Sequence, residues 1–361
     1  MPFACERCGA LYPTHGTPFR CPACGGLYDQ IAAPSFDLHQ VEVRQPGLWR
    51  YRAALDLPDG APRVWLGEGQ TPLVWLNEDG LEVGLKLENL NPTGSYKDRG
   101  SAVLLSQLLG RGVREAVEDS SGNAGASFAA YAACAGVKAR VYVPASASGP
   151  KLRQIQAYGA EVRAIAGPRS AAAAAVLQEA EAGVPYASHA YLPFGLAGIA
   201  TIAYELWEAG FRSGSIVAPV GHGGLLLGVL RGFVALQQAG LVQQLPHFVA
   251  VQAAACAPLV KAAQTGAPIV ESAEGQTVAE GVRVRSPMRG AAILRQAPAG
   301  QHDYLAVAEE DILPACQALA RRGFYVEPTS ALVWAALEQL RGKIPLPVVL
   351  ILTGSGLKYA G

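Results

Sequence analysis

Hydrophobic positions along the chain follow two alternating periods. Short runs such as "GLKLENL", "ARVYVP" and "FVAVQ" are typical of strands, whereas "SAVLLSQLL" and "LLLGVLRGFVALQQAG" have helical spacing. After "GEGQTPLVWL" strands and helices alternate, and the last strand is the all-apolar "PLPVVLILTG". This alternation predicts an α/β architecture with mostly parallel sheets covered on both faces.

Length and composition narrow the class of protein. A chain of 361 residues exceeds what one hydrophobic core usually supports, so we expect two domains. The 29 basic residues balance the 29 acidic ones, which gives no electrostatic footprint for nucleic acid. No apolar run reaches the ~18 residues of a membrane span, and no signal-peptide region is present. We therefore expect a cytoplasmic protein that acts on a small molecule.

Four of the seven cysteines form two Cys-x-x-Cys pairs near the N-terminus. They are Cys5, Cys8, Cys21 and Cys24, with twelve residues between the pairs. In a reducing compartment such pairs are metal ligands rather than disulfides, and two knuckles supply the four thiolates of a tetrahedral zinc site. Four thiolates leave no open position for substrate, so we expect a structural zinc ion.

A single lysine stands in an unusual place in "NPTGSYKDRG". The turn residues Pro92 and Gly94 precede Lys97, and helical spacing follows it, which predicts that Lys97 lies in the first turn of a helix. A lysine at a helix start is ordinarily a solvated surface residue. Its neighbours in the fold decide whether it has a chemical role.

Three strand ends carry polar or glycine residues that suit a ligand, because strand ends in parallel sheets point into the ligand crevice. The first is "DSSGNAG", where Ser120, Ser121, Gly122 and Asn123 precede a helix at Ala124. Hydroxyls and backbone amides at a helix N-terminus can hold a carboxylate. An ordinary helix cap would need only one serine.

The second strand end is the glycine loop "PVGHGGLLLG", and the third is "ILTGSG" with Thr353. Glycines between a strand and a helix let a phosphate approach backbone amides. A dinucleotide is disfavoured because Leu226 stands at the last position of the fingerprint, and Gln252 ends the next strand where an acid is expected. A phosphate cradle, a carboxylate cradle, a hydroxyl and a lysine together predict pyridoxal phosphate linked to Lys97 as a Schiff base.

These motifs, together with "VEPTSA" and "LTGSGLK", resemble the threonine synthase family among the fold type II, tryptophan-synthase-β-like pyridoxal enzymes. The likeness covers roughly four-fifths of the chain, and paired Cys-x-x-Cys leaders also occur in the family. The resemblance implies two open twisted α/β domains, a zinc-ribbon-like segment and a homodimer. We expect that segment over 1–32, a large domain over 33–90 and 190–361, and a small domain over 91–189.

The resemblance also implies roles for individual residues. Lys97 would form the Schiff base and then act as the base, Asn123 would bond the phenolic oxygen of the cofactor, and Thr353 would meet its pyridine nitrogen. The substrate carboxylate would be bound by Ser120, Ser121, Gly122, Asn123 and Ala124. The cofactor phosphate would be bound by Gly221, His222, Gly223, Gly224 and Leu225.

The implied reaction is the conversion of O-phosphohomoserine to threonine by a lyase. One departure bears on the substrate: Gly195 and Ala200 occupy positions where the family has an Arg and a Lys that bind its phosphate. Alternatives are β-elimination or β-replacement on serine, threonine or O-phosphoserine, as in dehydratases or cysteate synthase. A further alternative is a non-catalytic zinc-ribbon binding protein.

Overall fold

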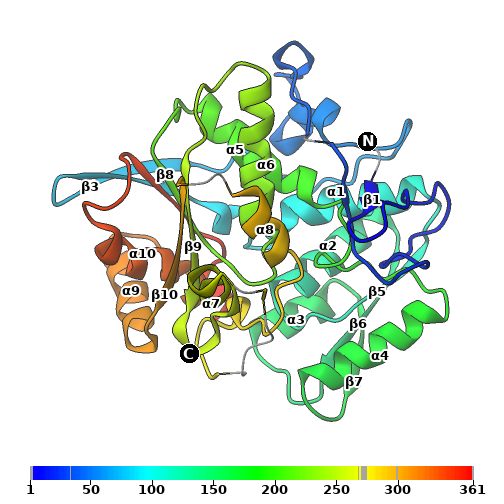
Figure 1. Cartoon of the computed structure of the whole chain (residues 1–361). Helices are drawn as coiled ribbons and strands as arrows, with labels where there is room; N and C mark the ends of the chain where they lie inside the picture. Colours follow the sequence, from blue (N-terminus) through cyan, green and yellow to red (C-terminus); the bar gives the residue numbers. More distant parts are fainter. Residues whose placement is uncertain (1–2, 33, 267, 270–274, 298–299, 360–361) are drawn as a thin grey trace. The chain divides into compact units, whose positions relative to one another are not determined.

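The computed structural model describes residues 3–32, 34–266, 268–269, 275–297 and 300–359 (Figure 1). The chain forms two compact units. Unit 1 comprises Met1–Gly69 and Lys97–Gly198, and unit 2 comprises Gln70–Tyr96 and Ile199–Tyr359.

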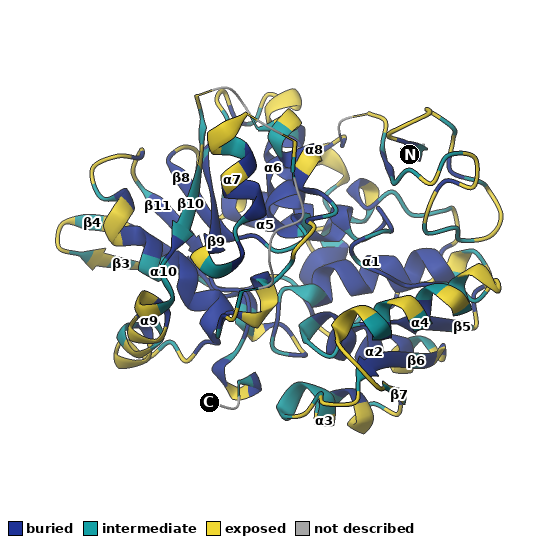
Figure 2. Cartoon of the chain, turned by 60° about the horizontal axis from the view of Figure 1, so that its bottom comes forward, coloured by how far each residue is buried: buried dark blue, intermediate teal, exposed yellow. Residues whose placement is uncertain are grey.

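Unit 1 is built on a parallel three-stranded sheet with the order β5-β6-β7. Its strands are β5 (Glu115–Glu118), β6 (Lys138–Pro144) and β7 (Glu161–Ile165), and its helices are α1 (Lys97–Gly110), α2 (Asn123–Ala135), α3 (Pro150–Ala157) and α4 (Arg169–Glu181). Figure 2 shows α1 and α2 as mostly buried, whereas α3 and α4 carry exposed faces. The two inner helices are the ones that begin at predicted site residues.

The N-terminal part of unit 1 contains little regular structure. It holds the antiparallel pair β1 (Phe3–Cys5) and β2 (Tyr28–Gln30) and the 3-10 helices η1 (Leu38–Gln40) and η2 (Gly47–Ala54). Leu48 and Trp49 of η2 belong to the same buried cluster as Ala102 and Leu105 of α1. Residues 34–69 therefore pack with unit 1, although the predicted division assigned 33–90 to the large domain, and residue 33 itself lies outside the described residues.

Unit 2 is built on a six-stranded sheet with the order β10-β9-β8-β11-β4-β3. Its strands are β3 (Leu73–Glu78), β4 (Leu81–Lys86), β8 (Ser215–Pro219), β9 (His247–Ala253), β10 (His302–Val307) and β11 (Val348–Ile351). All neighbours are parallel except β3 and β4. The edge strand β3 is therefore the only departure from a parallel sheet among these strands.

The helices assigned to unit 2 connect these strands. They are α5 (Leu196–Glu208), which begins in unit 1, α6 (Gly224–Gln238), α7 (Pro258–Thr265), α8 (Gly290–Gln296), α9 (Glu309–Arg321) and α10 (Pro328–Leu340), with the 3-10 helices η3 (Glu88–Leu90), η4 (Ala254–Cys256), η5 (Glu280–Val282) and η6 (Gly356–Lys358). None of the helices in the described part of the chain is long and apolar enough to cross a membrane. The predicted α/β fold class is confirmed.

The register of unit 2 brings two predicted site segments to one sheet edge. β8 and β11 are parallel neighbours, and Leu350 pairs with Val217. Because parallel strands end at the same edge, the glycine loop after β8 and Thr353 after β11 leave the sheet side by side.

Candidate active site

Lys97 directly follows a turn that is fastened to the last strand of unit 2. The amide of Gly94 donates to the carbonyl of Asn91 at 2.7 Å, and Gly94 has a φ of +83°. The amide of Tyr96 then donates to the carbonyl of Thr353 at 3.0 Å. The residue before Lys97 is thus tied to the strand end that carries Thr353.

A second lysine holds this turn in shape. Lys358 is 7% exposed, and its Nζ donates to the carbonyl of Thr93 at 2.7 Å. A Cβ added at Gly94 would lie 3.1 Å from Cδ of Lys358. The motifs "NPTG" and "GSGLK", far apart in sequence, are therefore two sides of one contact.

Lys97 itself is half-buried and begins α1, as predicted. The next residue, Asp98, is fully buried, and its Oδ1 accepts from the Ser127 hydroxyl of α2 at 2.6 Å. The same hydroxyl lies 2.8 Å from Oγ of Ser101. These bonds fasten the start of the lysine helix to the helix that begins at Asn123.

The loop from Ser120 to Ala124 joins β5 to α2. The amide of Ser120 donates to Oε2 of Glu118 at 2.5 Å, and the Ser120 hydroxyl accepts from the amide of Gly122 at 3.1 Å. The amides of Ser121 and Ala124 make no hydrogen bond within the described part of the chain. They are the donors that remain for an anion at the positive end of α2.

The glycine loop after β8 has the shape of a phosphate cradle. Gly223 caps α6 with a φ of +95°, and no side chain caps this helix. A Cβ at Gly221 would lie 2.7 Å from the carbonyl oxygen of Gly281. Only glycine fits both places without strain, and the loop leads into a 15-residue helix, at whose start backbone amides can bind an anion.

Thr353 is 2% exposed, and its hydroxyl has no hydrogen-bond partner among the described residues. A buried hydroxyl without a partner is costly and indicates a ligand atom or a bound water. The following Gly354 is held on both sides, since its amide donates to Oγ of Ser330 and its carbonyl accepts from the amide of Glu327. These two hydrogen bonds explain why the motifs "VEPTSA" and "LTGSG" lie next to each other in the structure.

Two residues of this region were absent from the predicted site. Glu118, at the end of β5, binds the amide of Ser120 and also faces the imidazole of His189 at 3.3 Å. The signal that could have located Glu118 is a pair of consecutive acids, Glu118 and Asp119, at the end of an apolar strand. No comparable signal marks His189.

The four N-terminal cysteines come together as predicted. Their Sγ atoms all lie within 4.8 Å of one another, with 3.4 Å between Cys5 and Cys24 and 3.6 Å between Cys8 and Cys21. Tetrahedral zinc with ~2.3 Å bonds to sulfur places its ligands about 3.8 Å apart. The donor set and its spacing fit a zinc ion.

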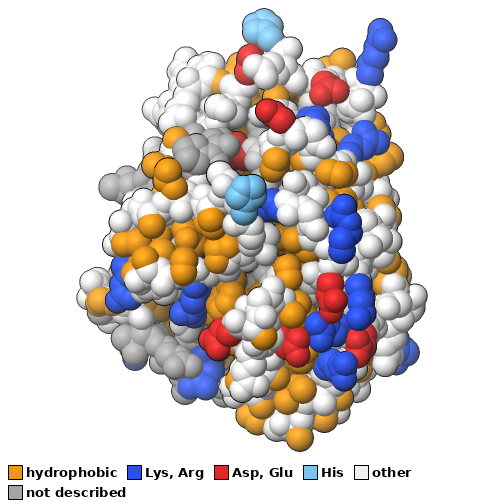
Figure 3. Space-filling view, turned by 90° about the vertical axis from the view of Figure 1, so that its right-hand side faces the viewer, with side chains coloured by type: hydrophobic (Ala, Val, Ile, Leu, Met, Phe, Trp, Pro, Cys, Tyr) orange, Lys and Arg blue, Asp and Glu red, His pale blue; other side chains and the backbone are white. Residues whose placement is uncertain are grey.

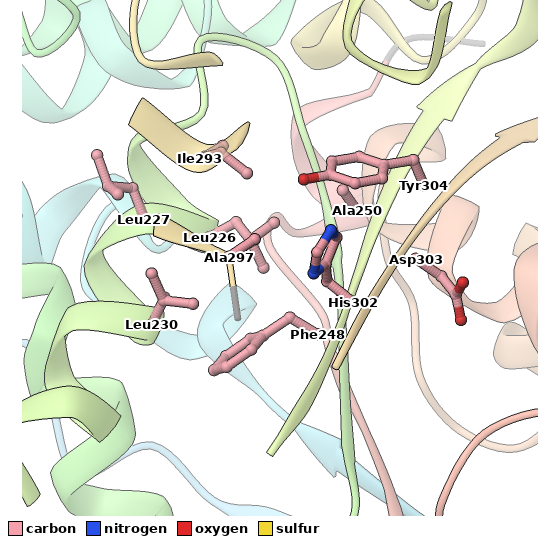
Figure 4. Close-up of a pocket in the computed structure, with 10 residues that line it drawn as sticks. All are labelled: Leu226, Leu227, Leu230, Phe248, Ala250, Ile293, Ala297, His302, Asp303 and Tyr304. Carbon is pink, nitrogen blue, oxygen red and sulfur yellow. The ribbon is translucent and has the colours of Figure 1, made fainter. Parts of the chain in front are cut away.

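A separate apolar pocket lies in unit 2 (Figure 4). It is lined by Leu226, Leu227, Leu230, Phe248, Ala250, Ile293, Ala297, His302, Asp303 and Tyr304. None of the predicted site residues is in this lining. The pocket therefore adds nothing to the candidate active site.

Comparison with known proteins identifies the family. The model of a family described as pyridoxal-phosphate dependent enzyme matches residues 64–354. The chain belongs to this family. The pyridoxal-phosphate-dependent lyase predicted from sequence, acting on an amino acid by elimination or replacement, is thereby confirmed, and the non-catalytic alternative is disfavoured.

Similar proteins within this family include two threonine synthases. That of Methanocaldococcus jannaschii is 34% identical over 336 residues, covering 88% of this chain and 82% of its own length. That of Methanosarcina acetivorans is 33% identical and covers 93% of this chain and 86% of its own length. Each alignment spans most of both proteins.

Solved structures of pyridoxal enzymes resemble the fold. A threonine deaminase from T.th. superposes with a TM-score of 0.69 at 29% identity, covering 81% of this chain and 94% of its own. Maize serine racemase gives a TM-score of 0.70 at 20% identity, which concerns the fold alone, and covers 79% of this chain and 88% of its own.

Proposed function

We propose that the protein is a lyase of the threonine synthase type, which converts O-phosphohomoserine to threonine. The observation that carries the proposal is the likeness to threonine synthases over nearly the whole chain, together with a half-buried lysine at the start of α1. The strand-end residues on which the sequence prediction rested, from Ser120 to Thr353, all lie within residues 64–354, which the family model matches.

The residues proposed for the cofactor fit a phosphate and an aromatic ring nitrogen. The cradle from Gly221 to Leu225 would hold the phosphate, and the unpartnered Thr353 hydroxyl would meet the ring nitrogen. Asn123 would bond the phenolic oxygen, and Nζ of Lys97 would carry the covalent link. When bound, pyridoxal phosphate supplies an electron sink for carbanion chemistry.

A hydroxyl at the ring nitrogen has a chemical consequence. Unlike an aspartate, the Thr353 hydroxyl does not stabilise a positive charge on that nitrogen, which favours elimination and replacement over transamination. Nζ of Lys97 would also be the base that takes the α-proton of the substrate. The substrate carboxylate is bound by the amides of Ser121 and Ala124 at the start of α2.

The two positions at which the family binds the substrate phosphate carry no cation here, and both are closely packed. A Cβ at Gly195 would lie 3.1 Å from the carbonyl oxygen of Gly100, and Ala200 is 2% exposed. Phosphate recognition must therefore come from other residues. This departure keeps a second candidate function open, namely β-elimination on serine or threonine, for which the 29% identity to a threonine deaminase is the supporting observation.

We further propose a structural zinc ion on Cys5, Cys8, Cys21 and Cys24. The left-handed Gly9 and Gly25, with φ of +73° and +72°, close the two knuckles. A Cβ at Gly26 would lie 2.6 Å from Sγ of Cys5, so the cluster is tightly enclosed.

The resemblance to threonine synthases also supports a homodimer in the cytoplasm. Sedimentation of the purified protein tests the oligomeric state.

The function is tested by incubating the purified protein, loaded with pyridoxal phosphate, with a panel of amino acids. The panel is O-phosphohomoserine, O-phosphoserine, serine and threonine, and the readouts are phosphate, ammonia, keto acid and threonine. Equal release of phosphate and threonine from O-phosphohomoserine supports the proposal. Ammonia and keto acid from serine or threonine alone would favour the second candidate.

A further inference from the structure

One buried side chain holds the residue that leads into the glycine loop of unit 2. Gln252, near the end of β9, is fully buried, and its carboxamide contacts two separate segments. Its Nε2 donates to the carbonyl of Val220 at 3.1 Å. Its Oε1 accepts from the amides of Leu259 and Val260 at 2.9 Å and 3.2 Å. Gln252 therefore joins the last residue before the glycine loop to the start of α7.

The contact with α7 takes the place of a helix cap and fixes the orientation of the carboxamide. Ala257 precedes the helix and has no side chain that could cap it. Gln252 supplies the acceptor instead, because its Oε1 accepts from the amides of the second and third residues of α7. Backbone amides can only donate, so the oxygen of the side chain faces α7 and its nitrogen faces Val220.

Both backbone groups of Val220 are bonded to consecutive residues of β9. Val220 is buried and directly follows β8, and its amide donates to the carbonyl of Val251 at 2.8 Å. Its carbonyl accepts from the side chain of Gln252. The first bond joins two backbones and is independent of side-chain identity. The second bond depends on the residue at position 252.

The direction of the Val220 carbonyl sets the direction of the next backbone amide. The peptide bond between Val220 and Gly221 is trans, and in a trans peptide group the carbonyl and the following N–H point in opposite directions within one plane. Because Gln252 holds the carbonyl on its own side, the amide of Gly221 points away from Gln252. This amide is one of the donors proposed for the cofactor phosphate.

The next peptide group but one is held in the same way. The carbonyl of His222 accepts from the amide of Arg289 at 2.8 Å, which sets the direction of the amide of Gly223. The amides of Gly221 and Gly223 make no hydrogen bond within the described part of the chain. Binding of an anion by such amides depends on their direction. Of the two bonds that set it, only the one from Gln252 comes from a side chain.

We propose that Gln252 is a positioning residue for the cofactor phosphate, which acts through the carbonyl of Val220 and the amide of Gly221. This inference rests on the proposed function, because it concerns the phosphate cradle assigned there. The position requires a donor toward Val220 and an acceptor toward α7, and a carboxamide has both on one group. An acid, which a dinucleotide site carries at the end of this strand, has no donor when ionised.

The experiment compares the affinity of the cofactor-free protein for pyridoxal phosphate and for pyridoxal. Both aldehydes can form the covalent link to Lys97, but only the first carries a phosphate. The absorption band of the link measures both affinities without turnover. We expect Gln252→Met, which keeps the length of the side chain but has no hydrogen-bonding group, to weaken pyridoxal phosphate about tenfold or more. Its affinity for pyridoxal should equal that of the wild type.

Ser215→Ala is the matched control. Ser215 is fully buried at the start of β8, and its hydroxyl donates to the carbonyl of Pro345 at 2.6 Å. This variant therefore also loses a buried hydrogen bond from a side chain to the backbone, but at the opposite end of the strand that leads to Val220. The ratio of its two affinities should equal that of the wild type, whatever the change in melting temperature.

A second variant separates the glycine loop from the cap of α7. Gln252→Glu has the same shape, and its carboxylate accepts from the amides of Leu259 and Val260, which stabilise its charge at the start of the helix. It has no proton to donate to Val220. At pH 9 this variant should keep α7 in place and still lose affinity for pyridoxal phosphate relative to pyridoxal. It also serves as the test if Gln252→Met does not fold.

Three results would overturn the inference. They are a wild-type ratio of the two affinities in either Gln252 variant, an equal loss of both affinities, or a wild type that binds the two aldehydes equally well. Failure of the proposed function gives a different result. The wild type would then prefer pyridoxal phosphate and the Gln252 variants would lose that preference, but the loaded wild type would release neither phosphate nor threonine from O-phosphohomoserine.

Discussion

Lys97 differs from a surface lysine in how firmly the preceding residues are held. The turn before it is closed by the Gly94 amide, braced by Nζ of Lys358, and paired with the carbonyl of Thr353. The following Asp98 is buried against α2. These contacts fix the backbone on both sides of Lys97, which is the kind of preorganisation that the proposed catalytic lysine requires.

We expect Lys97→Ala to abolish turnover and the visible absorption band of the lysine-linked cofactor, because only an amine can form the link. The melting temperature of the cofactor-free protein should change little, because the side chain is only half-buried. Lys138→Ala is the control, since the Lys138 side chain is 67% exposed. Full activity of the Lys97 variant with any substrate of the panel would refute the assignment.

Gly94 offers a test of the turn itself. Gly94→Ala places a side chain at a φ of +83° and within 3.1 Å of Cδ of Lys358. Gly112→Ala is the matched control, because Gly112 has a φ of +80° and nothing within 4 Å of its Cβ position. Each should lose about 1 kcal/mol from the backbone alone.

Only Gly94→Ala should also weaken retention of pyridoxal phosphate, because it displaces the turn before Lys97. Melting temperature and cofactor content after dialysis measure the two effects. Equal cofactor content in both variants would show that the turn does not position the lysine.

Residues within one motif were predictable, whereas residues paired across the chain were not. The places of Lys97 and Thr353 could be predicted because Lys97 begins a helix and Thr353 follows a strand, each with a clear hydrophobic period. Glu118 and His189 are 71 positions apart, and their meeting depends on how the segment after α4 returns to β5. No local pattern in the sequence indicates that these two segments meet.

At the level of elements, hydrophobic periodicity located most of the strands and helices. It missed β1, β2, β10, α5, α7 and α8. The start of α5 carries Gly198, which lowers helical propensity, yet a Cβ there would lie 2.0 Å from the carbonyl oxygen of Arg99. Close packing of α5 explains why a glycine stands at this position. Helical propensity alone would argue against a helix there.

The two cysteine knuckles are an element whose stability we expect to come from a metal ion. Replacing Cys5 and Cys8 with Ser should release about one zinc ion per chain and lower the melting temperature, with little effect on the chemical step. Cys134→Ser is the control, because Cys134 is an exposed thiol outside the cluster. Metal analysis and thiol titration make the measurement.

The zinc proposal has a clear contrary outcome. Wild-type protein that is free of metal, with all four thiols titratable and an unchanged melting temperature after chelation, would contradict it. A fall in activity that exceeds the fall in folded protein would indicate that the cluster does more than stabilise the N-terminal segment.

At the scale of the whole molecule, charge is balanced and locally mixed. The chain carries no net charge, and on the face shown in Figure 3 acidic and basic side chains lie next to one another. A chain without net charge gives no overall electrostatic attraction for an anion. Selection of the phosphorylated substrate proposed above must then depend on contacts at the site.

The buried Glu118 links the site to the pH dependence of overall stability. Its pKa is raised to about 8 from an ordinary value of 4.5, chiefly by burial. Between these values the folded protein binds more protons than the unfolded chain, so the contribution of this group to the free energy of unfolding falls as pH rises.

We therefore expect the stability of Glu118→Gln relative to wild type to be greater at pH 9 than at pH 5.5, because the variant has no carboxyl group to ionise in the interior. A difference on the order of 1 kcal/mol would shift the melting temperature by about 2 °C in a chain of this size. The measurement compares melting temperatures of cofactor-loaded wild type and variant at both pH values, with Glu161→Gln as the control, because Glu161 is an exposed partner of Arg163. An equal gap at the two pH values would mean that Glu118 is already ionised at pH 5.5 and that burial does not raise its pKa.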